Sequence, residues 1–215
     1  MYMEFRIFDV GHGFCAIAVA SNSNIILFDC GHKTYPEYRP SNFLPELGFK
    51  GIECLVVTNY DEDHISDFPN LQRVLPIEFL VHNTSISPQQ LKNLKKQGGP
   101  LSYAMQNLLD MMQNCTQGSG YQPLLPGIEW KWYWNSYGYE FEDTNNISVV
   151  NFVNNGYEKF LIPGDLEVKG WQGLLRDPNF CKELKDVTVF IASHHGRKKG
   201  DSRDTCKMGH VAKFC

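Results

Sequence analysis

The sequence has no long apolar run and no recognisable targeting segment. Its longest apolar runs, such as 25–28 and 187–192, fall far short of the roughly 20 residues that a membrane-spanning helix needs. The amino terminus carries an acidic residue, Glu4, and lacks the basic segment, apolar stretch and small-residue cleavage site of a secretory signal. We therefore expect a cytoplasmic protein that has no membrane partner.

The chain also lacks paired cysteines and an excess of positive charge. Its seven cysteines are odd in number, widely scattered and without a CxxC pair, which predicts that most are buried, reduced thiols. Cys206, His210 and Cys215 are three zinc-type ligands without a fourth, so we expect no zinc finger there. The formal net charge of -4 excludes a uniformly basic nucleic-acid binder. A polyanion would have to bind at a local basic patch.

The composition and the spacing of apolar residues predict one domain of the α/β class. A chain of 215 residues with 42% hydrophobic and 20% charged residues is typical of a single globular domain. We expect strands at 3–10, 14–20, 25–30, 52–58, 78–82, 128–135, 147–153, 159–162 and 187–193, and helices at 65–75, 88–96, 101–115 and 166–176. The first three strands should form an antiparallel meander, and those at 147–153 and 159–162 a hairpin. Strands with interleaved helices favour an α+β arrangement, with two mixed sheets between helices, over a doubly wound parallel sheet.

The domain is expected to span 1–200. Within it, 83–127 reads as a helical insertion or lid, because two helices there are separated by a Gly-Gly-Pro break. The tail 201–215 has no apolar strand-like run and is expected to be irregular.

The loop TNYDEDH, which follows the predicted strand at 52–58, concentrates metal-type ligands. Alternate residues of an extended loop face the same way, so Asn59, Asp61 and Asp63 can converge, and His64 joins them as the chain turns into a helix. Carboxylates held this close repel each other unless a cation neutralises them. The alternative is a solvated acidic loop in which Asp63 or Ser66 caps the helix.

Two further strand ends carry the same kinds of side chain. Asp165 follows Gly164 at the end of one strand, and the pair His194 and His195 follows another. Each has an ordinary explanation, because an aspartate can cap a helix and histidines are common surface residues. Three such strand ends in one chain favour a shared metal site.

These motifs resemble those of metallo-β-lactamase fold hydrolases, and the chain is similar to the hydrolase domain of ComEC-like competence proteins. The first loop resembles the family's HxHxDH loop. The other matching segments, in the family's order over 9–200, are Asp9-Val10-Gly11-His12-Gly13, Phe28-Asp29-Cys30-Gly31, Asn145-Asn146-Ile147-Ser148-Val149, Gly164-Asp165 and His194-His195-Gly196. The resemblance implies an αββα sandwich, and the tail would then be truncated or altered, since the family fold continues with a further strand and helix.

The resemblance also implies roles for individual residues. Metal ligands would be drawn from Asn59, Asp61, Asp63, His64, Asp165, His194 and His195, with Asp165 bridging two ions and one of the two histidines as the last ligand. Asp29, His12 and Asn146 would lie behind or beside the ligands. His12 could equally be an extra ligand, a proton carrier or a turn residue.

The chain departs from the family at two ligand positions, where Asn59 and Asp61 replace histidines. Oxygen ligands favour manganese or magnesium over zinc, and an amide oxygen is a weak ligand, so the site is expected to hold one or two divalent ions.

The expected activity is hydrolysis by a metal-activated water, most readily of a phosphodiester, as in a phosphodiesterase or nuclease. Asp61, Asp63 and His195 are the candidates for catalysis. Asp61 could accept the proton of the water, and either His194 or His195 could ligate or protonate the leaving group, so these two roles stay open between the two histidines. Arg197 and Lys198 could face a phosphate or form a solvated basic loop, and Tyr60 could stack a base. The alternatives are a thioester or lactone hydrolase on the same fold and a metal-poor binding module.

Overall fold

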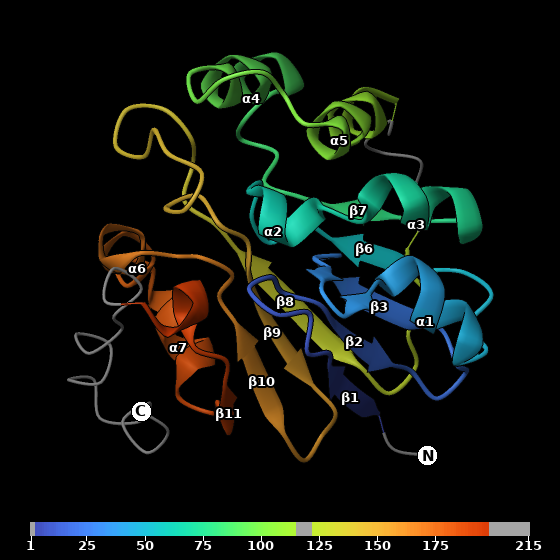
Figure 1. Ribbon diagram of the computed structural model, residues 1–215. Coiled ribbons are helices and arrows are strands. Elements are labelled where there is room, and N and C mark those ends of the chain that lie inside the picture. The colour runs from blue at the N-terminus through green and yellow to red at the C-terminus, as the bar shows by residue number, and fades with distance from the viewer. Residues whose placement is uncertain (1–2, 115–121, 198–215) are drawn as a thin grey trace. The chain divides into compact units, whose positions relative to one another are not determined.

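The computed structural model describes residues 3–114 and 122–197 (Figure 1). The chain divides into two compact units, unit 1 at Met1–Gly127 and unit 2 at Ile128–Cys215. Each unit contains its own sheet. The predicted extent of the domain, 1–200, stays a prediction. The tail 201–215, which contains Cys206, His210 and Cys215, lies outside the described residues, as do Cys115 and Lys198.

Unit 1 is built on a five-stranded sheet in the order β1-β2-β3-β6-β7. The strands are β1 (Glu4–Ile7), β2 (Ala16–Val19), β3 (Ile25–Phe28), β6 (Cys54–Val56) and β7 (Leu80–Val81). The first three are antiparallel, which confirms the predicted meander, and β6 and β7 run parallel to β3. Because β3 and β6 are parallel neighbours, the segments that follow them, which begin at Asp29 and Val57, leave the sheet at the same edge.

Helices and a hairpin connect the strands of unit 1. The helices are α1 (Pro40–Glu46), α2 (Glu62–Ile65), α3 (Phe68–Val74), α4 (Pro88–Lys96) and α5 (Tyr103–Asn114), and the hairpin is β4 (Lys33–Thr34) with β5 (Glu37–Tyr38). The predicted helix at 65–75 is observed as the shorter α3, because the chain breaks between α2 and α3. Pro69 stands in the first turn of α3, the helix position where its missing N–H costs least.

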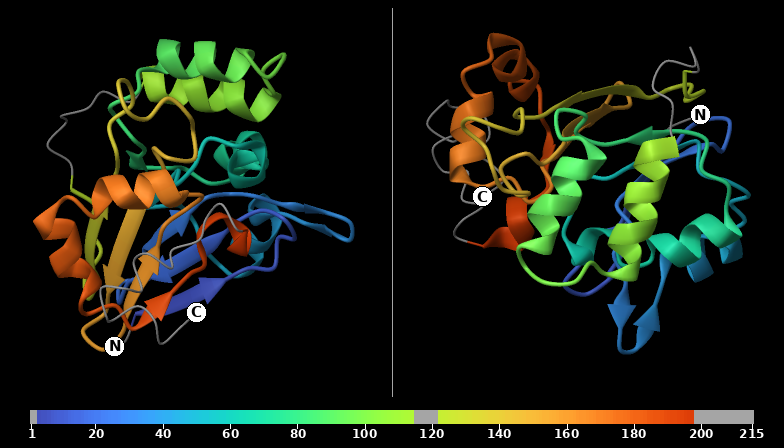
Figure 2. Two further views of the ribbon diagram at one scale, coloured as in Figure 1. Left: turned by 90° about the vertical axis from the view of Figure 1, so that its left-hand side faces the viewer. Right: turned by 90° about the horizontal axis from the view of Figure 1, so that it is seen from above.

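The helices α4 and α5 pack against each other, and α5 also contacts α2 and α3 (Figure 2). A capping box between Ser87 and Gln90 begins α4. The inner side of α5 is buried, with Leu108 fully covered and Met105 nearly so. The predicted helical segment is thus part of the packed body of unit 1, and a role as a lid stays a prediction.

Unit 2 is built on a four-stranded sheet in the order β11-β10-β9-β8. The strands are β8 (Glu129–Tyr133), β9 (Val150–Asn154), β10 (Lys159–Ile162) and β11 (Val189–Phe190). The pairs β8–β9 and β9–β10 are antiparallel, and β11 runs parallel to β10. The predicted hairpin between β9 and β10 is present, with Gly156 at φ +87° in its turn. The strand predicted at 187–193 is reduced to β11, and a 3-10 turn follows at Ser193–Gly196.

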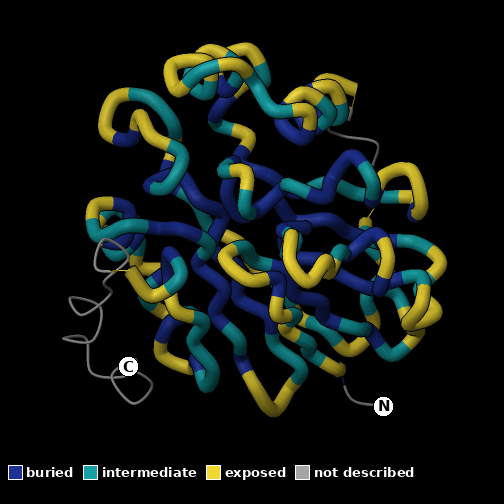
Figure 3. Tube along the Cα trace, in the orientation of Figure 1, coloured by how far each residue is buried: buried dark blue, intermediate teal, exposed yellow. Residues whose placement is uncertain are grey.

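The core of unit 2 lies between its sheet and two helices, α6 (Val168–Leu174) and α7 (Pro178–Leu184). Phe180 is fully buried and meets Phe152 of β9 at 5.6 Å and Trp171 of α6 at 6.1 Å between ring centroids. The predicted helix at 166–176 is observed as the shorter α6, and α7 was not expected. The buried segments include β2, β3 and β6 in unit 1 and β9 and most of β10 in unit 2 (Figure 3).

The structure therefore has the α/β class, with mixed sheets and interleaved helices, that the sequence predicts. The αββα sandwich, which requires one sheet to pack on the other, stays a prediction. Among the described residues, no helix is long and apolar enough to cross a membrane. Cys15, Cys30 and Cys54 are buried free thiols, as predicted, and burial raises the pKa of each well above its ordinary value.

Candidate metal centre

The part of the candidate site in unit 1 is centred on Asp29, which is fully buried directly after β3. Its Oδ1 accepts the Thr58 N–H at 2.7 Å, and its Oδ2 accepts the Thr58 hydroxyl. The same Oδ2 lies 2.7 Å from Nδ1 of His64. Burial raises the pKa of the Asp29 carboxyl, while the charge and hydrogen bond of His64 and the hydrogen bonds of Thr58 act to lower it.

This contact determines how His64 presents its ring. An ionised carboxylate only accepts hydrogen bonds, so the proton of the neutral imidazole is placed on Nδ1, which donates to Asp29. Nε2 is then the nitrogen with a lone pair for a metal ion. Metal-ligating histidines are commonly held in this way by a carboxylate behind them. Asp29 thus lies behind His64, where the resemblance places it.

The backbone around Asp63 and His64 is clamped by the loops after β1 and β3. The Phe14 N–H donates to the Asp63 carbonyl at 3.3 Å, and the Cys30 N–H donates to the His64 carbonyl at 2.8 Å. A Cβ on Gly13 would lie 2.3 Å from the Asp63 carbonyl oxygen, and one on Gly31 would lie 2.0 Å from it. The two glycines in the DVGHG and FDCG motifs are therefore required by this close approach.

Asn59 and Asp61, the first two predicted metal ligands of the loop, have hydrogen-bond or ion-pair partners inside unit 1. The Asn59 Oδ1 accepts the N–H of Asp61 at 2.7 Å, so this buried amide shapes the loop. The Asp61 Oδ1 lies 2.7 Å from the ammonium of Lys95 on α4. These contacts do not favour Asn59 or Asp61 as metal ligands, and their predicted roles as ligand and proton acceptor stay predictions.

Two further predicted residues of unit 1 differ in their surroundings. His12 is exposed on the loop after β1, with Nε2 at 3.7 Å from the Asp63 Oδ2, and its role beside the ligands stays a prediction. Tyr60 is only 2% exposed, and its hydroxyl donates to the Asn83 carbonyl at 3.0 Å. Burial raises the pKa of Tyr60 well above its ordinary value. The prediction that Tyr60 stacks a base is wrong, because its ring is packed in the interior.

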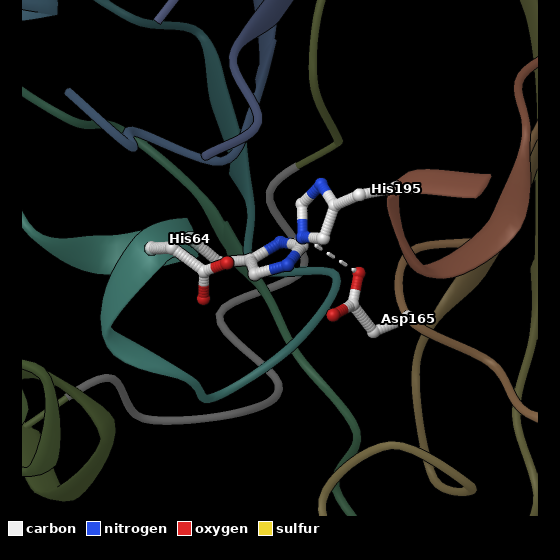
Figure 4. Close-up of side chains that lie close together, drawn as sticks. His64, Asp165 and His195 are labelled. Atoms are coloured by element: carbon white, nitrogen blue, oxygen red, sulfur yellow. Dashed lines mark ion pairs between the residues drawn. The ribbon is translucent and has the colours of Figure 1, made fainter. Parts of the chain in front are cut away.

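The part of the candidate site in unit 2 joins the ends of β10 and β11. Asp165 follows β10 and is 4% exposed. The imidazole of His195 faces it, with 3.4 Å between Nε2 and the Asp165 Oδ1 (Figure 4). The other oxygen of Asp165 lies 3.8 Å from Nε2 of His194, and Nδ1 of His194 lies 3.4 Å from Glu167. Unit 2 therefore brings together one buried carboxylate and both predicted histidines.

The backbone at the end of β11 has an unusual conformation. His194 and His195 both have positive φ, at +49° and +53°, in the left-handed region that residues with a side chain rarely adopt. The His194 N–H donates to the Gly164 carbonyl at 3.1 Å, which ties this turn to the end of β10. Two successive left-handed residues are costly, and such strain is typical of functional sites.

The remaining predicted residues of unit 2 lie around this cluster. The Asn146 Oδ1 accepts the Gly170 N–H at 2.7 Å, so Asn146 anchors α6 and supports the site only indirectly. Nη1 of Arg197 lies 3.5 Å from Nε2 of His194. Asn145 donates to the Oε1 of Glu167 at 3.3 Å and so helps to position the carboxylate next to His194.

Two residues near the site were not predicted, Lys95 and Glu167. Lys95 is distant in sequence from Asp61, and nothing in the pattern of α4 distinguishes it from the neighbouring lysines. Glu167 carried a weak signal, because it stands two residues after Asp165.

Four residues offer ligand atoms of the kinds that bind metal ions, Asp63 and His64 in unit 1 and Asp165 and His195 in unit 2. Two carboxylates and two imidazoles suit manganese or zinc. The residues present therefore fit the group that the sequence motifs imply.

Comparisons with known proteins include solved structures. The chain is similar to a solved structure described as the metallo-beta-lactamase fold protein YhfI from Bacillus subtilis, with 14% sequence identity and a TM-score of 0.45, over 88% of this chain and 70% of that chain. No family model and no curated protein matches the sequence. The ComEC-like resemblance stays a prediction.

Proposed function

We propose that this chain is a metal-dependent hydrolase of the metallo-β-lactamase fold, in which Asp63, His64, Asp165 and His195 together hold a divalent ion. The observation that carries the proposal is the pair between His64 and the buried Asp29, since a carboxylate on the far nitrogen is the usual support of a metal-ligating histidine. It is supported by Asp165 and His195, a carboxylate and an imidazole held together in unit 2.

A bound divalent ion would supply Lewis-acid chemistry, because it polarises a substrate oxygen and acidifies water. The chain's own residues would orient the donors and move protons. Asp29 holds the Nδ1 proton of His64, so that Nε2 is the nitrogen that can bind a metal ion. His194 has its two ring nitrogens at 3.4 Å from Glu167 and 3.8 Å from Asp165, so it can carry a proton between the site and Glu167.

The proposed substrate class is a phosphodiester. Arg197 supports it, because its guanidinium lies 3.5 Å from His194 and is suited to bind phosphate oxygens. This cation lies beside the histidine that would protonate a departing oxygen. A phosphodiester is the substrate that uses both features.

The first test is metal analysis of the purified chain, followed by cleavage of bis(p-nitrophenyl) phosphate with added manganese. We expect bound metal and manganese-dependent cleavage. Asp165→Asn should lower cleavage by on the order of 100-fold and weaken metal binding, because a ligand oxygen is replaced by an amide. Asp186→Asn, at an exposed position of the same unit, is the matched control and should behave as the original chain.

Three outcomes would contradict parts of the proposal. A chain that binds no metal and gains no activity from manganese is not a metal-dependent hydrolase. Full turnover of Asp165→Asn would refute the ligand assignment. Hydrolysis of p-nitrophenyl acetate or a thioester, without cleavage of the phosphodiester, would identify the substrate as an acyl compound.

A further inference from the structure

The segment 59–64, which runs from the loop after β6 into α2, carries four of the predicted metal ligands, but two of them already have strong partners in unit 1. Oδ1 of Asp61 lies 2.7 Å from the Lys95 ammonium, and the Asn59 Oδ1 accepts the Asp61 N–H at 2.7 Å. A carboxylate with an ammonium in direct contact is already neutralised. Asn59 and Asp61, in the first half of this segment, are therefore already engaged by protein groups. Asp63 and His64, in its second half, are the residues proposed to bind the ion.

Lys95 is held in place rather than carried on a flexible segment. It stands in the last turn of α4, where a positive charge is favourable at the helix carboxyl end. The helix begins with a capping box and packs against α5. Its side chain is 24% exposed and that of Asp61 is 36% exposed, so the pair is partly shielded from water. The Lys95 ammonium is thus held next to Asp61 by a packed helix.

We propose that the Lys95 ammonium takes the place of a second cation, so that the site holds a single divalent ion and Asp61 is not one of its ligands. A second divalent ion at Asp61 would have to approach the ammonium and would be repelled by its like charge. Lys95 is then a positioning residue that holds Asp61 and, through it, the shape of the loop. This inference rests on the proposed function, because it concerns the ion that the hydrolase would use.

The experiment is calorimetric titration of the apo chain with manganese alone, with activity not used as a readout. The original chain should bind about one ion, rather than the two of a two-metal hydrolase. Asp61→Asn should keep this stoichiometry and change the dissociation constant by less than about threefold, whereas Asp63→Asn should raise the constant at least tenfold, the order of effect that loss of a supporting group has on metal affinity. The two variants make the same chemical change two residues apart.

A variant of Lys95, the partner of Asp61, also tests this inference. Lys95→Met removes the ammonium and leaves Asp61 uncompensated, so a second, weaker manganese site should appear in the titration. Adding Asp61→Asn to Lys95→Met should abolish that second site. Lys96→Met changes an exposed lysine one position along the same helix and should leave the titration unchanged.

The outcomes separate this inference from the proposed function. Two equally tight ions in the original chain, or an Asp61→Asn variant as impaired as Asp63→Asn, would overturn the inference and leave the hydrolase proposal standing. A Lys95→Met chain that shows one unchanged ion would also contradict it. A chain that binds no manganese would overturn both.

Discussion

The two parts of the candidate site are held in different ways. In unit 1, His64 is supported by one hydrogen bond, at 2.7 Å, to a fully buried carboxylate, and the backbone around it is clamped between two glycine-containing turns. In unit 2, the histidines meet Asp165 only at 3.4 and 3.8 Å, which is longer than a hydrogen bond, and they stand on left-handed backbone. The unit 1 part is held by buried hydrogen bonds, and the unit 2 part is held by the backbone conformation of His194 and His195.

The difference indicates where substitutions will cost folding free energy and where they will cost only ligand binding. Removing a buried acceptor in unit 1 leaves several donors unsatisfied, and water cannot replace it. The contacts of His195 with Asp165 are longer and its side chain is 18% exposed, so substitution of His195 should mainly weaken metal binding. We therefore expect the stability of the protein to depend more on the unit 1 part.

The largest expected effect is that of Asp29→Ala. The substitution removes the acceptor of three buried donors, two on Thr58 and one on His64, and leaves alanine at φ +57°. We expect the free energy of unfolding to fall by at least about 3 kcal/mol, because each buried donor left without an acceptor costs about 1–3 kcal/mol. Urea unfolding followed by circular dichroism measures it. Asp9→Ala, at an aspartate whose side chain is 81% exposed, should leave the free energy of unfolding nearly unchanged. Equal losses in the two variants would show that the Asp29 cluster is not specially stabilising.

A smaller effect is expected for Gly31→Ala. The new methyl group would lie 2.0 Å from the Asp63 carbonyl oxygen and 2.9 Å from backbone atoms of Phe14, and backbone cannot move aside as a side chain can. Overpacking of this kind costs about 1–3 kcal/mol, which thermal unfolding would detect. Gly98→Ala is the matched control, since its methyl group would meet only the Lys95 carbonyl at 3.6 Å. A Gly31→Ala chain as stable as this control would contradict the clamp described for the loop.

The smallest effect is expected outside the site, at Glu183 on α7. Its carboxylate joins Lys131 of β8 and Lys159 of β10, each at 2.6 Å, and fastens the helix to the sheet of unit 2. Burial acts to raise the pKa of Glu183, but the hydrogen bonds and charges of the two lysines outweigh it, and the pKa is lowered. Glu183→Gln should therefore destabilise the protein at pH 7, by about 1 kcal/mol.

The pH dependence of this loss follows from the direction of the shift. A carboxyl group with a lowered pKa contributes stability above its unfolded pKa of about 4.3, and loses it as the pH falls through the folded pKa. The difference between the original chain and Glu183→Gln should therefore shrink when urea unfolding is repeated below pH 4. A difference that stays constant down to this range would mean that packing, and not charge, fastens α7.

Some elements were predictable from short stretches of sequence. The meander of β1 to β3 follows from three apolar runs separated by turn residues, and α4 follows from its capping residues. The break before α3 was missed, although Pro69 marked it, because the apolar spacing on both sides continues through the gap. The helix α7 was missed because its seven residues carry little periodic signal and are held mainly by Phe180 in the core.

For the site, the sequence by itself determined which residue types are present and where they stand along the chain, because strand ends and turn glycines are encoded locally. Asp63, His64 and Asp165 were recognisable for that reason. The tertiary structure decided the partners of these residues, which come from segments far apart in the chain. Only packing could join Lys95 to Asp61, 34 residues apart, and bury Tyr60 instead of exposing it. Direct contacts between distant residues depend on how elements pack, and a local pattern carries no record of that.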